Sequence, residues 1–477
     1  MKKIPSLEFR LPWALKFDDF PLDTFALLEP ETIHDFVIGR TREGVNGAAT
    51  FLGKVAESGL FDKKMWLDLE GAHAVYVMGK RRGGKSHTLG VICEGLASET
   101  WLTDLDDRQG ILVFDTMNVF LTIDQPTISI EGLDSGEIDW NMPGDMPKAQ
   151  LFRPGGTPTI AGRDFPEICL GAHDLTAEEW IQTLGIDQFA DVLGHLIYDA
   201  YERVRYSGYS TKAGEVEAQE LFGVGALERC VTSCSDLVNT FRDETRLAAI
   251  RRFKALSRNS IFDDHGLDLT RLLRPGVITV LLLRDLPPET RELFVAVLVR
   301  RVMEARSETE HYERLLAAQG QTKSPYAETW KARVQAGTPR AWLVIDEAHN
   351  YIPQGRSAIS KRPLKRLIDE GRNLGISILV ATQQPSGLDT SIQRNADTLI
   401  IHPMSMEDDI RAASGMLNTV WPKKTSIARG GNLKGCDFYD AVRSLPRGYA
   451  LISTETMPRV IPLLVRPRLT ESGGKGY

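Results

Sequence analysis

The sequence has little of what marks membrane or secreted proteins. No apolar run approaches the roughly 20 residues that are needed to span a bilayer. Lys2 and Lys3 stand near the start, but the apolar core of a signal peptide does not follow them. We therefore expect a cytoplasmic protein with no membrane-inserted segment.

Cysteine is also scarce, because the 477 residues include only five cysteines, an odd number at scattered positions. This pattern excludes the disulfide framework that small secreted domains use. Cys230 and Cys234 are spaced by one helical turn, but no second Cys/His pair lies nearby. Two residues on one helix face explain this spacing better than a metal site does.

An excess of basic residues is missing as well. The formal net charge is −7, so any contact with nucleic acid must come from local basic features. The content of 42% hydrophobic and 25% charged residues is ordinary for a soluble globular protein. The length allows two or three domains, and we find no internal repeats or low-complexity segments.

A glycine-rich loop is the most informative feature that is present. Its residues fit the pattern G-x-x-x-x-G-K-[ST] and are Gly79, Lys80, Arg81, Arg82, Gly83, Gly84, Lys85 and Ser86, followed by His87. An apolar run over 74–78 predicts a strand before the loop, and 86–96 predicts a helix after it. Such a turn directs backbone N–H groups at nucleotide phosphates. We expect Lys85 at a solvated position, reaching the β- and γ-phosphates of ATP, and Ser86 to ligate Mg²⁺.

A pair of acids ends a second apolar run, Ala341–Ile345. A buried parallel strand delivers such residues to the carboxyl edge of a sheet, where ligands bind in open α/β folds. Asp346 is expected to hold Mg²⁺ through water, and Glu347 to orient and polarise the attacking water. This second carboxylate favours nucleotide hydrolysis over nucleotide binding alone.

Strand-like and helix-like segments alternate along most of the chain, which predicts an α/β fold with a mainly parallel sheet. We expect a small β-rich module over 1–70, an ATPase domain over 71–465 and a C-terminal tail over 466–477. A helical insertion interrupts the ATPase domain at about 125–262, where a capping box at Thr176–Glu179 starts a helical pattern that runs to about Arg205. The polar segment 318–338 is predicted to be a mobile loop. Further strands are predicted at 111–115, 277–283, 376–382, 398–402 and 449–453.

Taken together, the motifs resemble the HerA/FtsK class of P-loop motors, and the HerA proteins most closely. The resemblance rests on the loop that opens with Gly79-Lys80-Arg81 and on segments 346–350, 370–375, 381–386 and 465–470. It implies a RecA-like ATPase core that assembles into a homo-hexamer and translocates double-stranded DNA. The family often works beside a nuclease, in DNA end processing or in defence against phage.

By the same resemblance, Arg372 corresponds to an arginine finger that enters the neighbouring subunit's site. The alternative is an arginine at a helix end that pairs with Asp369 or with a C-terminal carbonyl. Gln383 corresponds to a residue that senses the γ-phosphate, and a buried glutamine bonded to backbone groups is its alternative. Asp115 is either a functional acid or a strand-end cap. We expect His349 to be a packed or hydrogen-bonded histidine, because Glu347 already supplies the base.

The sequence departs from the family in two places. The family often has Gly-Ser-Gly before the lysine, whereas this loop has Arg82-Gly83-Gly84, so Arg82 is a candidate for contact with phosphate or with a neighbour. The N-terminal module is short compared with the barrel of HerA proteins, to which partners often attach.

Two basic clusters are candidates for contact with the DNA backbone. The first contains Arg356, Lys361, Arg362, Lys365 and Arg366, and the second contains Lys423, Lys424 and Arg429, with Trp421 nearby. A solvated basic face explains either cluster equally well.

The leading hypothesis from sequence is therefore an ATP-driven DNA translocase. The alternative is a scaffold ATPase whose nucleotide state controls a partner effector, such as a nuclease or a sirtuin-like NAD-consuming protein encoded nearby. A pumping ATPase of the conjugation type would need a membrane partner. We find no nuclease constellation in this chain, so cleavage would require another protein.

Overall fold

The computed structural model describes residues 35–39, 49–57, 63–98, 108–127, 140, 146–160, 162–186, 191–318, 324–421, 437–457 and 459–473. The chain forms two compact units. The first contains residues 1–150, 270–280 and 302–477, and the second contains residues 151–269 and 281–301. The boundaries of these units differ from the domain boundaries expected from the sequence. The expected domain boundaries remain predictions.

The first unit is built on a large sheet whose strands lie in the order β1-β3-β2-β17-β16-β15-β4-β14-β13-β5-β12. From β15 to β5, every strand is parallel to its neighbours. Beyond β15, strands β16, β17, β2 and β3 follow in antiparallel pairs. The strands are β1 (Phe36–Ile38), β2 (Ala49–Val55), β3 (Lys64–Asp68), β4 (Ala74–Met78), β5 (Gly110–Asp115), β12 (Val277–Leu282), β13 (Ala341–Ile345), β14 (Ile376–Thr382), β15 (Thr398–Ile401), β16 (Tyr449–Thr454) and β17 (Ile461–Val465).

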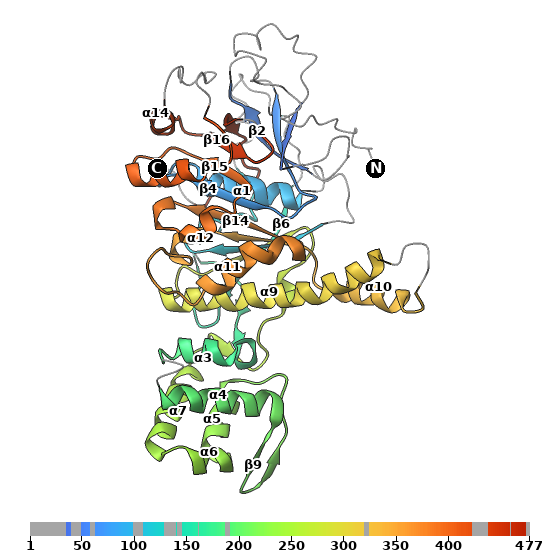
Figure 1. Cartoon of the computed structure of the whole chain (residues 1–477), viewed down its shortest axis with the longest axis vertical. Coiled ribbons are helices and arrows are strands. Elements are labelled where there is room, and N and C mark those ends of the chain that lie inside the picture. The colour runs from blue at the N-terminus through green and yellow to red at the C-terminus, as the bar shows by residue number, and fades with distance from the viewer. Residues whose placement is uncertain are drawn as a thin grey trace. The chain divides into compact units, whose positions relative to one another are not determined.

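The parallel strands are buried along their whole length, which explains why they read as continuous apolar runs in the sequence. Every residue of β4, β5, β13 and β14 is buried. Helix α1 (Lys85–Ala97) packs on β2, β4, β5 and β14 (Figure 1). The predicted α/β fold with a mainly parallel sheet is confirmed.

Helices of the first unit connect the strands of the sheet. α11 (Lys361–Glu370) buries Leu364, Leu367 and Ile368 against the sheet side and leaves its charged face exposed. Further helices are α10 (Ala327–Ala336), α12 (Thr390–Gln393), α13 (Glu407–Gly415) and α14 (Phe438–Ser444). Helix α9 (Pro288–Ala317) starts in the second unit and ends in the first.

The second unit is mainly helical. Its helices are α3 (Ala177–Thr183), α4 (Val192–Glu202), α5 (Val224–Ser233), α6 (Ser235–Thr240) and α7 (Asp243–Leu256), and a hairpin joins β9 (Tyr209–Thr211) to β10 (Gly214–Val216). Trp180 is fully buried here, with its ring 5.9 Å from Phe253 and 5.4 Å from Phe262. The unit contains a short parallel pair in which Arg153 and Pro154 of β6 (Lys148–Pro154) face β7 (Glu167–Ile168).

Several local predictions need correction. The capping box is present, because Thr176 accepts from Glu179 N at 3.2 Å and donates its own N–H to the Glu179 carboxylate at 2.9 Å. The helix that it starts ends at Thr183 rather than near Arg205, and a separate helix, α4, follows. The segment 318–338, predicted as a mobile loop, contains the helix α10. Among the described residues, no helix is both long and apolar enough to cross a membrane.

Candidate active site

The glycine-rich loop lies between β4 and α1, as predicted. Gly79 has φ +157° and Gly84 has φ +118°, which are values that favour glycine. Arg82 adopts φ +62°, an uncommon conformation for a residue with a side chain. Internal bonds close the loop, because Gly83 N donates to Lys80 O at 3.0 Å. The backbone is thus held in the strained turn that a phosphate cradle requires.

A buried histidine that the sequence did not single out supports this loop. The Cβ of an alanine at Gly79 would lie 2.6 Å from the Cβ of His402, and one at Gly84 would lie 2.9 Å from its ring. The ring is neutral, since burial lowers the pKa of His402 to about 3. Its Nδ1–H donates to Tyr449 O at 3.1 Å, and its Nε2 accepts from the Thr88 hydroxyl at 2.8 Å. Both ring nitrogens are therefore satisfied with one fixed tautomer.

Lys85 starts α1 and is 5% exposed, so the expected solvated position is wrong. Its Nζ donates to Lys80 O at 3.2 Å. Burial lowers the pKa of Lys85, and the carboxylates of Glu347 and Asp346 oppose this shift. The ammonium is thus bonded to the loop, lies close enough to the acid pair to feel its charge, and is shielded from bulk water.

The acid pair follows β13, which pairs with β5 and β14 at the centre of the sheet. Glu347 N donates to Asp346 Oδ1 at 3.0 Å, and Glu347 itself adopts φ +54°. Burial, together with the nearby Glu347 and Asp115 carboxylates, raises the pKa of Asp346 to about 7 despite Lys85. Two buried acids side by side repel each other, so a cation bound at this point would stabilise their ionised forms.

Gln383 contacts the proposed base directly. Its Nε2 donates a hydrogen bond to Glu347 Oε1. His349 lies on the other side, with Nδ1 3.5 Å from Glu347 Oε2 and 3.1 Å from Thr382 Oγ1. His349 is thus a hydrogen-bonded histidine beside Glu347, and Gln383 is bonded to a carboxylate rather than to backbone groups. A role of Gln383 as γ-phosphate sensor stays a prediction.

Asp115 is a strand-end cap in this structure. Its carboxylate is fully buried and accepts the N–H groups of Met117 at 3.0 Å, Val119 at 3.2 Å and Phe120 at 2.8 Å. These bonds fix the turn after β5. Asp115 acts on the site through its charge, which contributes to the raised pKa of Asp346.

The residues expected to hold Mg²⁺ fit such an ion. Ser86 and Asp346 offer hydroxyl and carboxylate oxygens, the hard donors that Mg²⁺ prefers. Glu347 Oε2 is buried without a hydrogen-bond partner, and Asp346 is buried among other acids. A divalent cation would offset both. Protein ligands of this kind are few at such sites, because phosphate oxygens and water complete the shell.

Arg372 lies at the opposite edge of the sheet from the phosphate loop. It belongs to the 3-10 turn Gly371–Leu374, which precedes β14. In the parallel pair of β14 with β4, Thr382 faces Met78 at the loop end. The seven residues of β14 span ~20 Å at the usual rise per residue. Arg372 therefore cannot reach the phosphate loop of its own chain.

The contact that Arg372 makes differs from the expected helix-end alternatives. Its Nη2 donates to Asp397 Oδ2 at 2.9 Å, whereas Asp369 accepts from Asn395 at 2.8 Å. The Arg372 side chain remains 53% exposed. The structure thus brings together the loop, the acid pair and Gln383, and it separates Arg372 from them.

The first basic cluster is partly neutralised. Lys361 pairs with Asp389 at 2.6 Å, and Arg366 pairs with Glu370 at 2.8 Å. Arg356 donates to Asn350 O at 2.8 Å. For Arg362 and Lys365, no acidic partner lies among the residues that the structure describes. Lys423, Lys424 and Arg429 of the second cluster lie outside the described residues.

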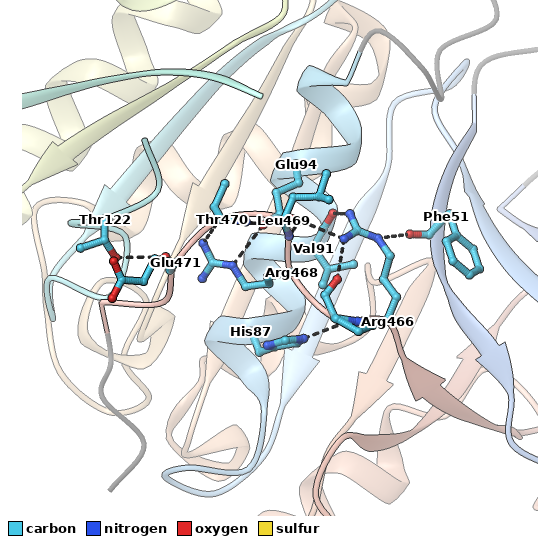
Figure 2. A network of polar contacts seen from close by, with 11 residues as sticks. Phe51, His87, Val91, Glu94, Thr122, Arg466, Arg468, Leu469, Thr470 and Glu471 are labelled. Atoms are coloured by element: carbon cyan, nitrogen blue, oxygen red, sulfur yellow. Dashed lines mark hydrogen bonds and ion pairs between the residues drawn. The ribbon is translucent and has the colours of Figure 1, made fainter. Parts of the chain in front are cut away.

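His87, expected near the nucleotide, instead contacts the C-terminal segment. Its Nε2 lies 2.8 Å from Arg466 O (Figure 2). The same segment runs along α1, where Glu94 accepts from Arg466 Nη1 at 2.9 Å and from Thr470 N at 3.0 Å. Gly90 allows this approach, since a Cβ there would lie 2.5 Å from the guanidinium carbon of Arg468. The helix that follows the phosphate loop is therefore braced by residues near the end of the chain.

A P-loop ATPase is defined by a strand, a glycine-rich phosphate loop and a helix, together with two acids at the end of a parallel strand. Here these acids follow β13, which is separated from β4 by β14. The sequence matches the family model "Helicase HerA, central domain" over residues 77–302. This match covers just under half of the chain and supports the resemblance to P-loop ATPases of the HerA/FtsK class that the motifs indicated.

Curated relatives are similar to parts of this chain. A DNA double-strand break repair helicase HerA of Pyrococcus furiosus is 24% identical over 311 residues, covering 62% of this chain and 53% of that protein. The protein of the same name from Sulfolobus acidocaldarius is 24% identical over 199 residues, covering 41% of this chain and 33% of that protein. The chain spans about half the length of the first of these relatives, and a third of the second.

Solved structures show a more distant likeness. VirB4 of Thermoanaerobacter pseudethanolicus aligns with a TM-score of 0.48 and 13% identity over 89% of this chain and 98% of that one. The plasmid coupling protein TrwB in complex with ADP and Mg²⁺ aligns with a TM-score of 0.43 and 11% identity over 84% of this chain and 86% of that one.

Proposed function

We propose that this chain is one subunit of a hexameric ring that hydrolyses ATP with Mg²⁺ and translocates double-stranded DNA. The family region at 77–302 and the relatives that are named DNA repair helicases support this proposal. The geometry of the site supports the hydrolysis step. The chain spans about half the length of its first relative, so DNA as the substrate is a proposal. It rests on the family resemblance and on the basic residues.

Each residue of the site has a distinct task in the proposed reaction. Lys85 contacts the β- and γ-phosphates and offsets charge that develops on the γ-phosphoryl group. Glu347 orients the attacking water and accepts its proton, while Gln383 holds the Glu347 carboxylate. Mg²⁺, held by Ser86 and Asp346, would supply charge neutralisation between the phosphates. Binding and water activation are thus provided within one subunit.

The observation that carries the ring is the position of Arg372. The phosphate loop lies at the carboxyl edge of β4, while Arg372 lies before the amino end of the adjacent, parallel β14. Its exposed guanidinium is available to another chain. A site that needs an arginine to stabilise transition-state charge, an effect of ~10³ or more in rate, would obtain it from a neighbouring subunit.

The substitution Glu347→Gln tests the hydrolysis step. The amide keeps the shape and the bond to Gln383 but is a poor base, so we expect nucleotide binding to persist and turnover to fall ~10²–10⁴-fold. Binding is measured with a fluorescent ATP analogue and turnover by phosphate release. Glu370→Gln is the matched control, because Glu370 is half-exposed on α11 and pairs there with Arg366. Turnover within a few-fold of wild type in Glu347→Gln would show that another group is the base.

Stimulation by DNA separates a translocase from a scaffold ATPase. A translocase hydrolyses ATP faster when linear duplex DNA is added, and Glu347→Gln then abolishes movement as well as hydrolysis. A scaffold responds to nucleotide binding alone and keeps its effect on a partner in that variant. Exposed Arg362 and Lys365 are the first candidates for contact with the phosphate backbone, each of which would contribute about −0.9 to the salt slope of binding.

We also propose a cytoplasmic location and a partner effector, either a nuclease or a NAD-consuming protein, in DNA processing or phage defence. The family resemblance supports this part. Co-expression with the product of the adjacent gene, followed by cleavage and NAD-consumption assays on the purified complex, tests both kinds of effector.

A further inference from the structure

The partner of Arg372 is a buried carboxylate rather than a surface one. Asp397 is 6% exposed and directly precedes β15. Its Oδ2 accepts the Arg372 guanidinium at 2.9 Å and the backbone N–H of Ala74 at 2.8 Å. Ala74 is the first residue of β4, the strand that leads to the phosphate loop. The exposed arginine is thus tied to the centre of the sheet.

Asp397 is itself held in place by a buried histidine. His73 lies with Nδ1 3.5 Å from Asp397 Oδ2 and Nε2 3.5 Å from Asp68 Oδ2. Although burial opposes the charged ring, the Asp397 and Asp68 carboxylates raise the pKa of His73 to about 9. The imidazolium therefore stabilises two acids. Burial alone would raise the pKa of Asp397, but His73 and Arg372 hold this pKa below its ordinary value. Asp397 remains ionised for Arg372.

The turn that carries Arg372 is fixed from a second side. Buried Arg306 donates from Nε to Leu374 O at 2.8 Å, at the end of this turn, and from Nη1 to Thr338 O at 2.8 Å. Backbone and guanidinium of the Arg372 segment are therefore held independently. In the described part of the chain, Asp397 is the one acid bonded to Arg372, which leaves the other N–H donors of its half-exposed guanidinium facing solvent.

We propose that Asp397 is the positioning residue of Arg372: it holds the guanidinium by one corner and presents the remaining donors to the γ-phosphate bound by a neighbouring subunit. The inference rests on the proposed function, because it assumes that Arg372 acts in trans. Its own content is that a buried acid at the amino edge of one subunit sets the rate at a site in the next.

The test is the substitution Asp397→Asn in mixed rings. The amide oxygen can still accept from Ala74 N, but the charge that aligns Arg372 is lost. We expect a homogeneous Asp397→Asn ring to keep its KM for ATP and to lose at least tenfold in kcat. Mixed with Lys85→Ala subunits, it should regain hydrolysis, because intact phosphate loops then meet intact fingers. Mixed with Arg372→Ala subunits, it should regain nothing, because both defects lie on the same side of the interface.

A purely structural role of Asp397 predicts a different pattern. A damaged fold would impair the subunit's own site, raise KM, and leave the mixture with Lys85→Ala inactive, which overturns the proposal. So does wild-type turnover of Asp397→Asn when Arg372→Ala is inactive. If Arg372→Ala is itself fully active, the trans finger of the proposed function fails instead. Asp369→Asn is the matched control and should behave as wild type, since Asp369 bonds to Asn395 and not to Arg372.

A second variant covers the case in which Asp397→Asn does not fold. His73→Gln removes the cation between Asp68 and Asp397 and leaves the Asp397 side chain in place. We expect the same sorting in mixed rings, with a smaller loss of kcat. Recovery with Arg372→Ala subunits but not with Lys85→Ala subunits would contradict the proposal for either variant.

Discussion

At the scale of single residues, the site depends on backbone conformations that side chains disfavour. Gly79, Gly84, Arg82 and Glu347 all have positive φ in the loop and at the acid pair. Strain of this kind costs about 1–3 kcal/mol at each non-glycine residue and persists only where the surroundings enforce it. Here His402, the residue after β15, lies against both glycines, so the shape of the loop is set by this contact as well as by its own sequence.

Gly79→Ala tests this contact. The added Cβ would lie 2.6 Å from the Cβ of buried His402, at a φ that alanine rarely adopts, so the loop must shift. We expect the loss of measurable ATP binding and a destabilisation of about 1–3 kcal/mol. Titration with a fluorescent nucleotide measures the binding, and denaturant unfolding measures the stability. Gly415→Ala is the matched control, because nothing lies within 4 Å of its Cβ position. Unchanged ATP affinity in Gly79→Ala would mean that the loop geometry is not limiting.

The charge of His73 makes stability depend on pH. Its pKa is about 9 in the folded chain and 6.5 as the ordinary value, so folding favours the protonated ring. The stabilisation is fully present below pH 6.5 and is lost as pH rises through 9, with an upper limit of about 3 kcal/mol. Urea unfolding at pH 6.5 and pH 9.5 measures this loss. His73→Gln should show a flatter dependence, and an identical slope in both proteins would refute the assignment.

At the scale of elements, a buried cluster of charged residues ties α1 to the segment that follows β17. Glu94 and Arg466 are fully buried, and Arg468 is 4% exposed. Although burial opposes ionisation, the two guanidinium groups lower the pKa of Glu94. Leu469 N and Thr470 N complete the shell of this carboxylate at 3.0 Å each (Figure 2). A buried pair of this type is costly to break because the remaining partner keeps an uncompensated charge.

Glu94→Ala should therefore destabilise the first unit by about 3–5 kcal/mol and loosen α1. Denaturant unfolding and hydrogen exchange of 85–97 measure the two effects. Glu407→Ala, which removes an exposed carboxylate paired with Arg411, should change stability by less than about 0.5 kcal/mol. Equal unfolding midpoints for the two variants would show that the brace contributes nothing to stability.

Elements whose signal is local could be predicted from the sequence, and elements defined by distant contacts could not. The buried runs 74–78, 341–345 and 376–382 are strands because each is apolar throughout. The strand β17 was not predicted. It contains Pro462, which disfavours a strand in the sequence, and its pairing with β16 and β2 is set by distant contacts. Helix α10 has no buried residue, so it carries no amphipathic pattern that would reveal it.

The same reasoning applies to the site. The loop and the acid pair were predicted because their function requires fixed local spacing. His402 and Asp397 were not, because each is brought to its partner by the pairing of β15 with β4. Arg372 was found through its motif, but its partner was not, since Asp397 lies 25 residues further along the chain.

At the scale of the whole molecule, the proposal requires that chains complete one another's sites. Arg372→Ala and Lys85→Ala rings should each be inactive, the first lacking the finger and the second lacking the phosphate contact. Mixed before assembly, they should recover hydrolysis at interfaces that join an intact loop to an intact finger. Light scattering with ATP and Mg²⁺ should show about six chains. Mixed rings no more active than either parent would assign Arg372 to a structural role.

β14 has a consequence for timing in such a ring. It is buried throughout, with the turn of Arg372 before one end and Gln383 just after the other. A strand held between β4 and β13 cannot stretch, so a displacement at one end arrives at the other. In each protomer, β14 would thus couple the nucleotide site at Gln383 to the position of Arg372, which we propose acts in the next protomer. We therefore expect hydrolysis at neighbouring sites of the ring to be coupled rather than independent.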